Sequence, residues 1–274
     1  MSLVLLKIIF SVTIFVAGGT GVLFPWLMKR GAPGDRFLTW GDTFAGGVLA
    51  GAGLVHLLSS GAAAFGELKP GPGYPLAFTL AGCGFFLILL IEAVIVADPD
   101  PRESPLHSSS RGAGHEIGPW AQGAGRHPFV LILLIVLSIH SIILGITLGA
   151  QSSRAGALLI FIAIMAHKIM AGFALGISYH RTGASLHRVI PILIFFSSMT
   201  PFGILLGTVI ESIVSTRSQM FFEAVFDSIG AGTFVYIATL DIIRTEFELP
   251  GDNWQKWLLA FMGFGIMAVL AMWI

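Results

Sequence analysis

Charged residues are scarce in this sequence of 274 residues, and cysteine is almost absent. Only 11% of the residues are Asp, Glu, Lys or Arg, whereas a soluble domain carries roughly 25%. The 15 basic and 15 acidic residues give a formal net charge of zero, so the chain lacks the basic field that would attract nucleic acid. The single cysteine, Cys83, excludes an internal disulfide and a zinc site built from several cysteines.

Long apolar segments dominate the sequence: 55% of the residues are hydrophobic, and the mean hydropathy is +0.87. A helix needs about 20 apolar residues to cross the hydrocarbon core of a bilayer, whereas an open sheet would leave backbone polar groups unpaired in lipid. Eight segments meet the helical requirement: 3–28, 38–60, 74–97, 129–151, 155–179, 189–213, 221–243 and 254–274. The sequence therefore predicts an all-α, polytopic membrane protein with eight transmembrane helices.

The first segment, 3–28, has one feature of a signal peptide, because a basic residue, Lys7, stands near its start. It has no obvious small-x-small cleavage site, however. We therefore interpret it as a membrane-spanning helix.

The connectors between these segments are short, with one exception at about 98–128. This connector is rich in Pro, Ser, Gly and Arg, a composition typical of a flexible loop. Its histidines, His107, His115 and His127, are either ordinary solvated side chains or weak ligands that capture metal. We expect the whole chain, 1–274, to form a single transmembrane domain with this one flexible loop.

Basic residues are distributed unequally between the connectors on the two sides of the membrane. Ten lie on one side: Lys29, Arg30, Arg36, Arg102, Arg111, Arg126, Arg181, Arg188, Arg244 and Lys256. Four lie on the other: Lys7, Lys69, Arg154 and Arg217. Because Lys and Arg accumulate in cytosolic loops, we expect loop 98–128 in the cytosol and both termini on the non-cytosolic side of a plasma or organelle membrane.

A few polar side chains fall at membrane depth, where each charged group costs at least about 2.5–3.5 kcal/mol on insertion scales. Groups that persist there usually face a cavity and have a function. His140 lies eleven residues into its segment and His167 twelve residues into the next, antiparallel one, so the two reach a similar depth. The others are His56, Glu92, Ser141, Lys168, Thr200, Asp227 and Asp241.

Two imidazoles at matching depth can form half of a metal site, because neutral histidine is a common zinc ligand at about 2.0–2.1 Å. The alternative for each is hydrogen-bonded packing. Gly145 and Gly149 lie four residues apart in one segment, as do Gly172 and Gly176 in the next. This spacing lets helix backbones approach closely, so we expect the two helices to pack together and bring the imidazoles face to face.

The motifs around these residues resemble those of the ZIP (Zrt/Irt-like) family of metal transporters. His140 and Ser141 begin HSIILGITLGAQ, and His167 and Lys168 begin HKIMAGFALG. Further similar stretches are FAGGVLAGAGLVHLL, SSMTPFGILLG and AGTFVYIATLDII, which include His56, Pro201 and Asp241 in that order. Together they cover most of the predicted spans in the expected order.

The resemblance implies a transporter, not an enzyme, that moves zinc, iron, manganese or a related ion toward the cytosol. The metal is its substrate, and no prosthetic group is expected. The first, fourth, fifth and sixth spans would form a transport bundle, and the other four a scaffold that is often a homodimer. His140 and His167 match the family's histidine ligands, and Ser141 and Lys168 match the flanking second-site positions.

Two other residues are candidates for an exit route. Asp241 takes the place of a glutamate often found near the inner end of the seventh span, and Glu92 lies in the inner part of the third. Lys168 either serves as a fixed positive charge or forms an ion pair with Asp241 or Glu92. Near predicted span ends, Asp42, Glu211 and Asp227 are either gate residues or interfacial ones.

The sequence departs from the family pattern where many members have an acidic residue four positions after one or both of these histidines. Those positions are Leu144 and Ala171 here, so two neutral imidazoles would bind the ion without a protein anion. This departure favours one alternative, a relative that senses metal or acts as a scaffold without transport. A second alternative is an intramembrane zinc hydrolase, although the chain has no HExxH motif.

Overall fold

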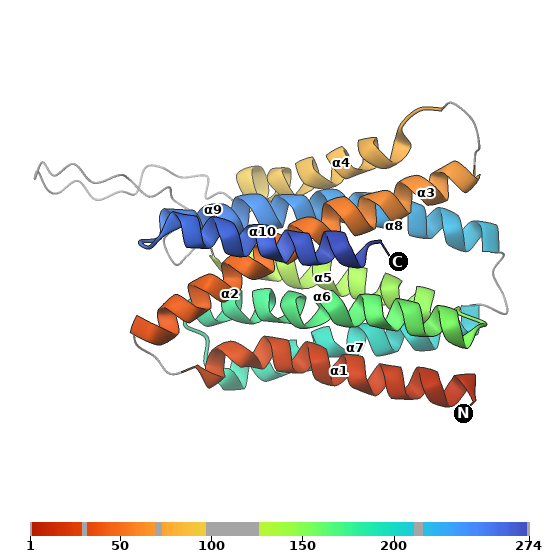
Figure 1. Cartoon of the computed structure of the whole chain (residues 1–274), viewed down its shortest axis with the longest axis horizontal. Helices are drawn as coiled ribbons and strands as arrows, with labels where there is room; N and C mark the ends of the chain where they lie inside the picture. The colour runs from red at the N-terminus through yellow and green to blue at the C-terminus, as the bar shows by residue number, and fades with distance from the viewer. Residues whose placement is uncertain (1, 29–31, 69–72, 97–125, 211–215, 273–274) are drawn as a thin grey trace, which may run out of the picture.

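The structure, a computed structural model, describes residues 2–28, 32–68, 73–96, 126–210 and 216–272. All regular structure in these ranges is helical (Figure 1). The α-helices are α1 (Leu3–Leu27), α2 (Ala32–Gly51), α3 (Leu58–Leu68), α4 (Leu76–Leu90), α5 (Arg126–Gly149), α6 (Arg154–Arg181), α7 (Leu186–Ile210), α8 (Thr216–Tyr236), α9 (Arg244–Glu248) and α10 (Asn253–Leu270). Three π-helical segments complete the set: η1 (Ala52–Leu57), η2 (Ile91–Val96) and η4 (Ile237–Ile243).

Seven helices in the described ranges are long and apolar enough to cross a membrane. They coincide with the first seven predicted segments, and α10 coincides with the eighth. The second differs most at its boundary, because α2, η1 and α3 form one continuous helical stretch to Leu68 instead of ending near residue 60. Most of the predicted loop at 98–128 lies outside the described residues, as do its histidines His107 and His115 and the candidate gate residue Glu211.

The helices form two groups. Bundle A consists of α1, α5, α6 and α7, in which α1 packs on α6 and α7, and α5 packs on α7 and α6. Bundle B consists of α2–α3, α4, α8–α9 and α10, in which α10 packs on α2, and α8 packs on α3 and α4. The two bundles meet mainly where α2 contacts α6 and where α5 contacts α8. This division matches the bundle and scaffold that the sequence resemblance implies.

Bundle A is held together by backbone contacts at glycines, but between different helices from those expected. A Cβ on Gly145 would lie 2.4 Å from the Thr200 carbonyl oxygen of α7. One on Gly176 would lie 2.4 Å from the Val22 carbonyl oxygen of α1. The expectation that these glycines join α5 to α6 is therefore wrong: they join α5 to α7 and α6 to α1, although α5 and α6 also contact each other.

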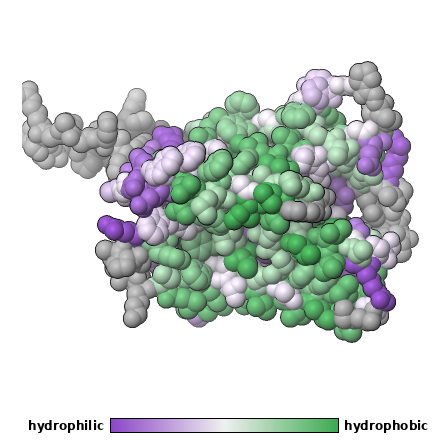
Figure 2. All heavy atoms as spheres, in the orientation of Figure 1, coloured by the Kyte–Doolittle hydropathy of each residue, from purple (hydrophilic) through white to green (hydrophobic). Residues whose placement is uncertain are grey.

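Large apolar side chains are exposed along the length of most helices, including Leu131 on α5 and Phe261 on α10. Figure 2 shows hydrophobic residues over the middle of the visible face and hydrophilic ones gathered at its two ends. Lipid tails would cover this apolar surface. We refer to the end where α6 stops and α10 begins, on the left in Figure 1, as the Arg181 end.

Candidate metal centre

Three histidines from three different helical stretches meet in the interior, between bundles A and B. His140 of α5 and His167 of α6 are 6% and 3% exposed, and their ring centroids lie 5.8 Å apart. His56 of η1 brings a third imidazole, with its ring centroid 6.1 Å from that of His167. Phe234 of α8 packs edge-on against the His140 ring, with centroids 4.8 Å apart, and so fixes the position of that ring.

The Nε2 atoms of His140 and His167 are buried and have no hydrogen-bond partner. Buried polar atoms nearly always have one, because an unpaired one costs free energy. Two zinc-bound imidazoles in tetrahedral geometry have ring centroids roughly 5 Å apart, close to the observed separation. No three His, Cys, Asp or Glu side chains of the described ranges converge closely enough to hold an ion together, so water or a small shift of His56 would have to complete the coordination.

Next to the histidine pair, Lys168 binds uncharged groups. Its Nζ donates to Ser141 Oγ at 2.8 Å and to Thr200 Oγ1 at 3.2 Å. It also lies 3.9 Å from the centroid of the Phe196 ring, an arrangement that favours an ammonium group. The predicted alternative of an ion pair with Asp241 or Glu92 is therefore wrong, because two hydroxyls and an aromatic face surround this amine.

Glu92 and Asp241 lie together, but away from the histidines. The Tyr236 hydroxyl donates to Glu92 Oε2 at 3.0 Å, and the two carboxyl groups are close enough to interact electrostatically. Glu92 Oε1 and Asp241 Oδ2 are buried without a partner. Asp241 follows Phe234, the neighbour of His140, by two helical turns, or about 10 Å toward the Arg181 end.

Each π-helical segment carries one of these polar residues: His56 in η1, Glu92 in η2 and Asp241 in η4. A π-helical turn adds a residue to the helix and shifts its side chains around the axis, and such turns are frequent at functional sites. Three of the polar residues at membrane depth thus lie in locally irregular helix.

The sequence analysis counted His56 among the polar side chains at membrane depth but did not include it in the metal site. The helical stretch continues to Leu68, so His56 lies well inside it. The available signal was a histidine in an apolar run. Its contact with His167 depends on the packing of bundle B against bundle A, which no local pattern specifies.

Fold and centre together define an all-helical, multi-pass membrane protein with histidines clustered in its interior. A family model described as "ZIP Zinc transporter" matches residues 96–271, which is more than half of the chain, and the protein belongs to this family of zinc transporters. Membership places it among transporters and not enzymes, so the hydrolase alternative is set aside.

Several named zinc transporters are similar over most of their length. Zinc transporter ZIP1 of Mus musculus is 30% identical over 261 residues, covering 88% of this chain and 80% of the relative. Zinc transporter 11 of Arabidopsis thaliana is 28% identical, covering 99% and 86%. Zinc transporter ZIP2 of Mus musculus is 26% identical, covering 93% of each chain.

Proposed function

We propose that this protein carries zinc, or a related divalent transition metal such as iron or manganese, across a membrane toward the cytosol. The observation that carries this proposal is the buried pair His140 and His167, whose Nε2 atoms have no partner. The names of the relatives support zinc as the ion. The excess of basic residues at the Arg181 end supports a cytosolic position for that end.

His140 and His167 would bind the ion, and His56 would add a third imidazole from bundle B. Three histidines and a water form a common zinc coordination sphere. Leu144 is packed in an apolar cluster and Ala171 is buried, so no carboxylate reaches the ion from the next helical turn. Neutral ligands suit zinc better than Ca²⁺ or Mg²⁺, which prefer carboxylate oxygens.

The Lys168 ammonium would take the place of a second metal ion. The resemblance assigns Ser141 and Lys168 to a second site, and the Lys168 amine binds Ser141 directly. A positive charge there repels a further cation. The centre would therefore hold one ion at a time.

Glu92 and Asp241 would receive the ion after it leaves the histidines. Their unpartnered oxygens lie closer to the Arg181 end than the histidines do, and carboxylates attract a cation that moves toward the cytosol. Transport would require bundle A to move against bundle B so that the centre opens to each side in turn. Bundle B is also where we expect two copies of the chain to form a homodimer.

Uptake of radioactive zinc into proteoliposomes tests this proposal, with Fe²⁺, Mn²⁺ and Cd²⁺ as competitors. The test variant is His140→Ala/His167→Ala, and the matched control is His187→Ala, which replaces an exposed histidine of α7. Saturable uptake that only the double variant loses supports the proposal. Wild-type uptake by the double variant refutes the site, and absence of uptake of any ion by folded protein favours the sensing or scaffolding relative.

A further inference from the structure

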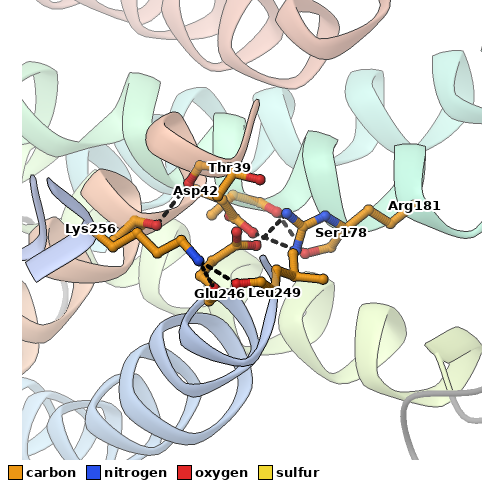
Figure 3. Close-up of polar contacts among 9 residues, drawn as sticks. Thr39, Asp42, Ser178, Arg181, Glu246, Leu249 and Lys256 are labelled. Carbon is orange, nitrogen blue, oxygen red and sulfur yellow. Dashed lines mark hydrogen bonds and ion pairs between the residues drawn. The ribbon is translucent and has the colours of Figure 1, made fainter. Parts of the chain in front are cut away.

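A buried cluster of charged residues joins the two bundles at the Arg181 end (Figure 3). Arg181, the last residue of α6, places Nη1 3.1 Å from Asp42 Oδ2 of α2. Its Nη2 contacts Glu246 Oε1 of α9. The carboxylate side chains are 4% and 0% exposed, whereas the Arg181 side chain is 22% exposed.

Lys256 of α10 completes the cluster from the other side of Glu246, as Figure 3 shows. Its Nζ donates to the backbone oxygens of Glu246 at 2.8 Å and of Leu249 at 2.6 Å. Two cations and two carboxylates give the cluster a formal charge of zero. Asp42, Glu246 and Lys256 belong to bundle B, and Arg181 is the one member from bundle A. The ion pairs of this cluster therefore connect the two bundles through one side chain, that of Arg181.

The helix α6 connects Arg181 to the metal centre. His167 and Arg181 lie on the same uninterrupted helix, 14 residues or about 21 Å apart. Between them, Phe173 of α6 packs on Gly41 of α2, where a Cβ would lie 2.6 Å from the ring. The last third of α6, from the ring of Phe173 to the guanidinium of Arg181, is thus held against bundle B.

We propose that Asp42 and Glu246 are positioning residues that hold α6 through Arg181 and so keep the Arg181 end of the histidine centre closed. This inference rests on the proposed function, because it assigns the cluster to the step in which the ion is released at that end. Arg181 has to leave both carboxylates for α6 to separate from α2. The two buried carboxylates are costly without their cationic partner, so the cluster sets how often this end opens.

Thiol labelling can report this opening. In a Cys83→Ser background the reporter is Ser178→Cys, since Ser178 is buried one turn before Arg181 on α6. A membrane-impermeant thiol reagent is applied from the Arg181 side of proteoliposomes. The test variants are Glu246→Gln, which keeps shape and hydrogen-bonding capacity, and Arg181→Lys, which keeps charge but loses the two-pronged contact.

Glu248→Gln is the matched control. Glu248 also pairs with an arginine, Arg244, at 3.1 Å and at the same end, but this pair is exposed and lies within one helix. Both test variants should raise the labelling rate by about tenfold, a typical allosteric coupling, and the control should leave it unchanged. Zinc binding to the detergent-solubilised protein should stay within roughly twofold of wild type, because the histidines are not altered.

Unchanged labelling in Glu246→Gln and Arg181→Lys would overturn the proposal. So would a loss of zinc binding that parallels faster labelling, since the cluster would then only maintain the fold. The labelling readout does not depend on transport. If the protein does not take up zinc but shows the expected labelling pattern, the proposed function is refuted and the closing role of the cluster is supported. If the protein takes up zinc but labelling does not change in the variants, the proposed function is supported and the closing role is refuted.

Discussion

His167 lies between two other imidazoles, with its ring centroid 5.8 Å from His140 on one side and 6.1 Å from His56 on the other. The central ring belongs to bundle A, as does that of His140, whereas His56 belongs to bundle B. A metal bound by all three would join the bundles, and a metal bound by the first two would travel with bundle A. In the proposed mechanism, the ligand set would therefore change with conformation while the ion stays on His167.

The first prediction concerns the order of importance of the three histidines. His167→Ala should weaken zinc binding most, because His167 belongs to both close imidazole pairs, the one with His140 and the one with His56. His140→Ala and His56→Ala should each leave one such pair and cost less, roughly 10–100-fold in affinity. Equilibrium zinc binding to purified protein measures the order, with His187→Ala as control. A His56→Ala variant that binds zinc like wild type would exclude His56 from the coordination sphere.

The second prediction concerns the amine of Lys168. Lys168→Gln keeps a hydrogen-bond donor for Ser141 and Thr200 but removes the positive charge near the histidines. Zinc should bind more tightly, by roughly tenfold, since a repulsion between cations is lost. The number of bound ions per chain should also rise above one at high zinc concentration. Isothermal titration measures both quantities, and an unchanged affinity and stoichiometry would show that Lys168 has only a structural role.

The third prediction concerns the close contact of α5 with α7. Gly145→Ala would place a Cβ 2.4 Å from the Thr200 carbonyl oxygen, and backbone cannot move as a flexible side chain does. We expect a loss of about 1–3 kcal/mol in stability from this overpacking. The control is Gly82→Ala on α4, whose Cβ would meet nothing within 4 Å and which should gain up to about 1 kcal/mol of helix propensity. Thermal unfolding in detergent compares the two variants. Equal unfolding midpoints would argue against the close contact between Gly145 of α5 and the backbone of α7.

These residues also show how far sequence reasoning extends. Apolar length predicted the spans, because the cost of unpaired backbone in lipid leaves few alternatives. Glycine spacing predicted that backbones approach at Gly145 and Gly176, but not which helix approaches, since a small residue does not identify its partner. Asp42 and Arg181 are distant in sequence and carry no mutual pattern, so their contact emerges only from the packing of α2 on α6.

The same limit applies to the site. The depths of His140 and His167 follow from counting residues along two spans, and the structure places the rings close together. The partners of Lys168 do not follow from such a count, because counting residues gives the depth of a side chain but not its direction. Hydroxyl groups, aromatic rings and carboxylates all occur at a similar depth in the sequence. The π-helical segments at His56, Glu92 and Asp241 have no sequence rule, and they change which side chains face inward.

The last prediction restores the carboxylate that the sequence lacks. Leu144 follows His140 by one helical turn, so its side chain projects from the same face of α5. Leu144→Asp would place an anion next to the imidazole pair, and Leu144→Asn is the control of equal size without charge. The anion should tighten zinc binding by at least about tenfold, because a charged ligand offsets the charge of the ion in a low-dielectric interior.

Tighter binding in Leu144→Asp should also slow release, so the maximal rate of uptake should fall together with KM. Measurements of initial uptake rates over a range of zinc concentrations separate the two effects. If Leu144→Asp raises the maximal rate of uptake without a change in KM, the absence of a carboxylate in the wild-type centre does not serve to speed the release of zinc. If Leu144→Asn behaves like Leu144→Asp, the change arises from altered packing around Leu144 and not from charge. The proposed centre requires that the maximal rate of uptake and KM both fall in Leu144→Asp and that neither falls in Leu144→Asn.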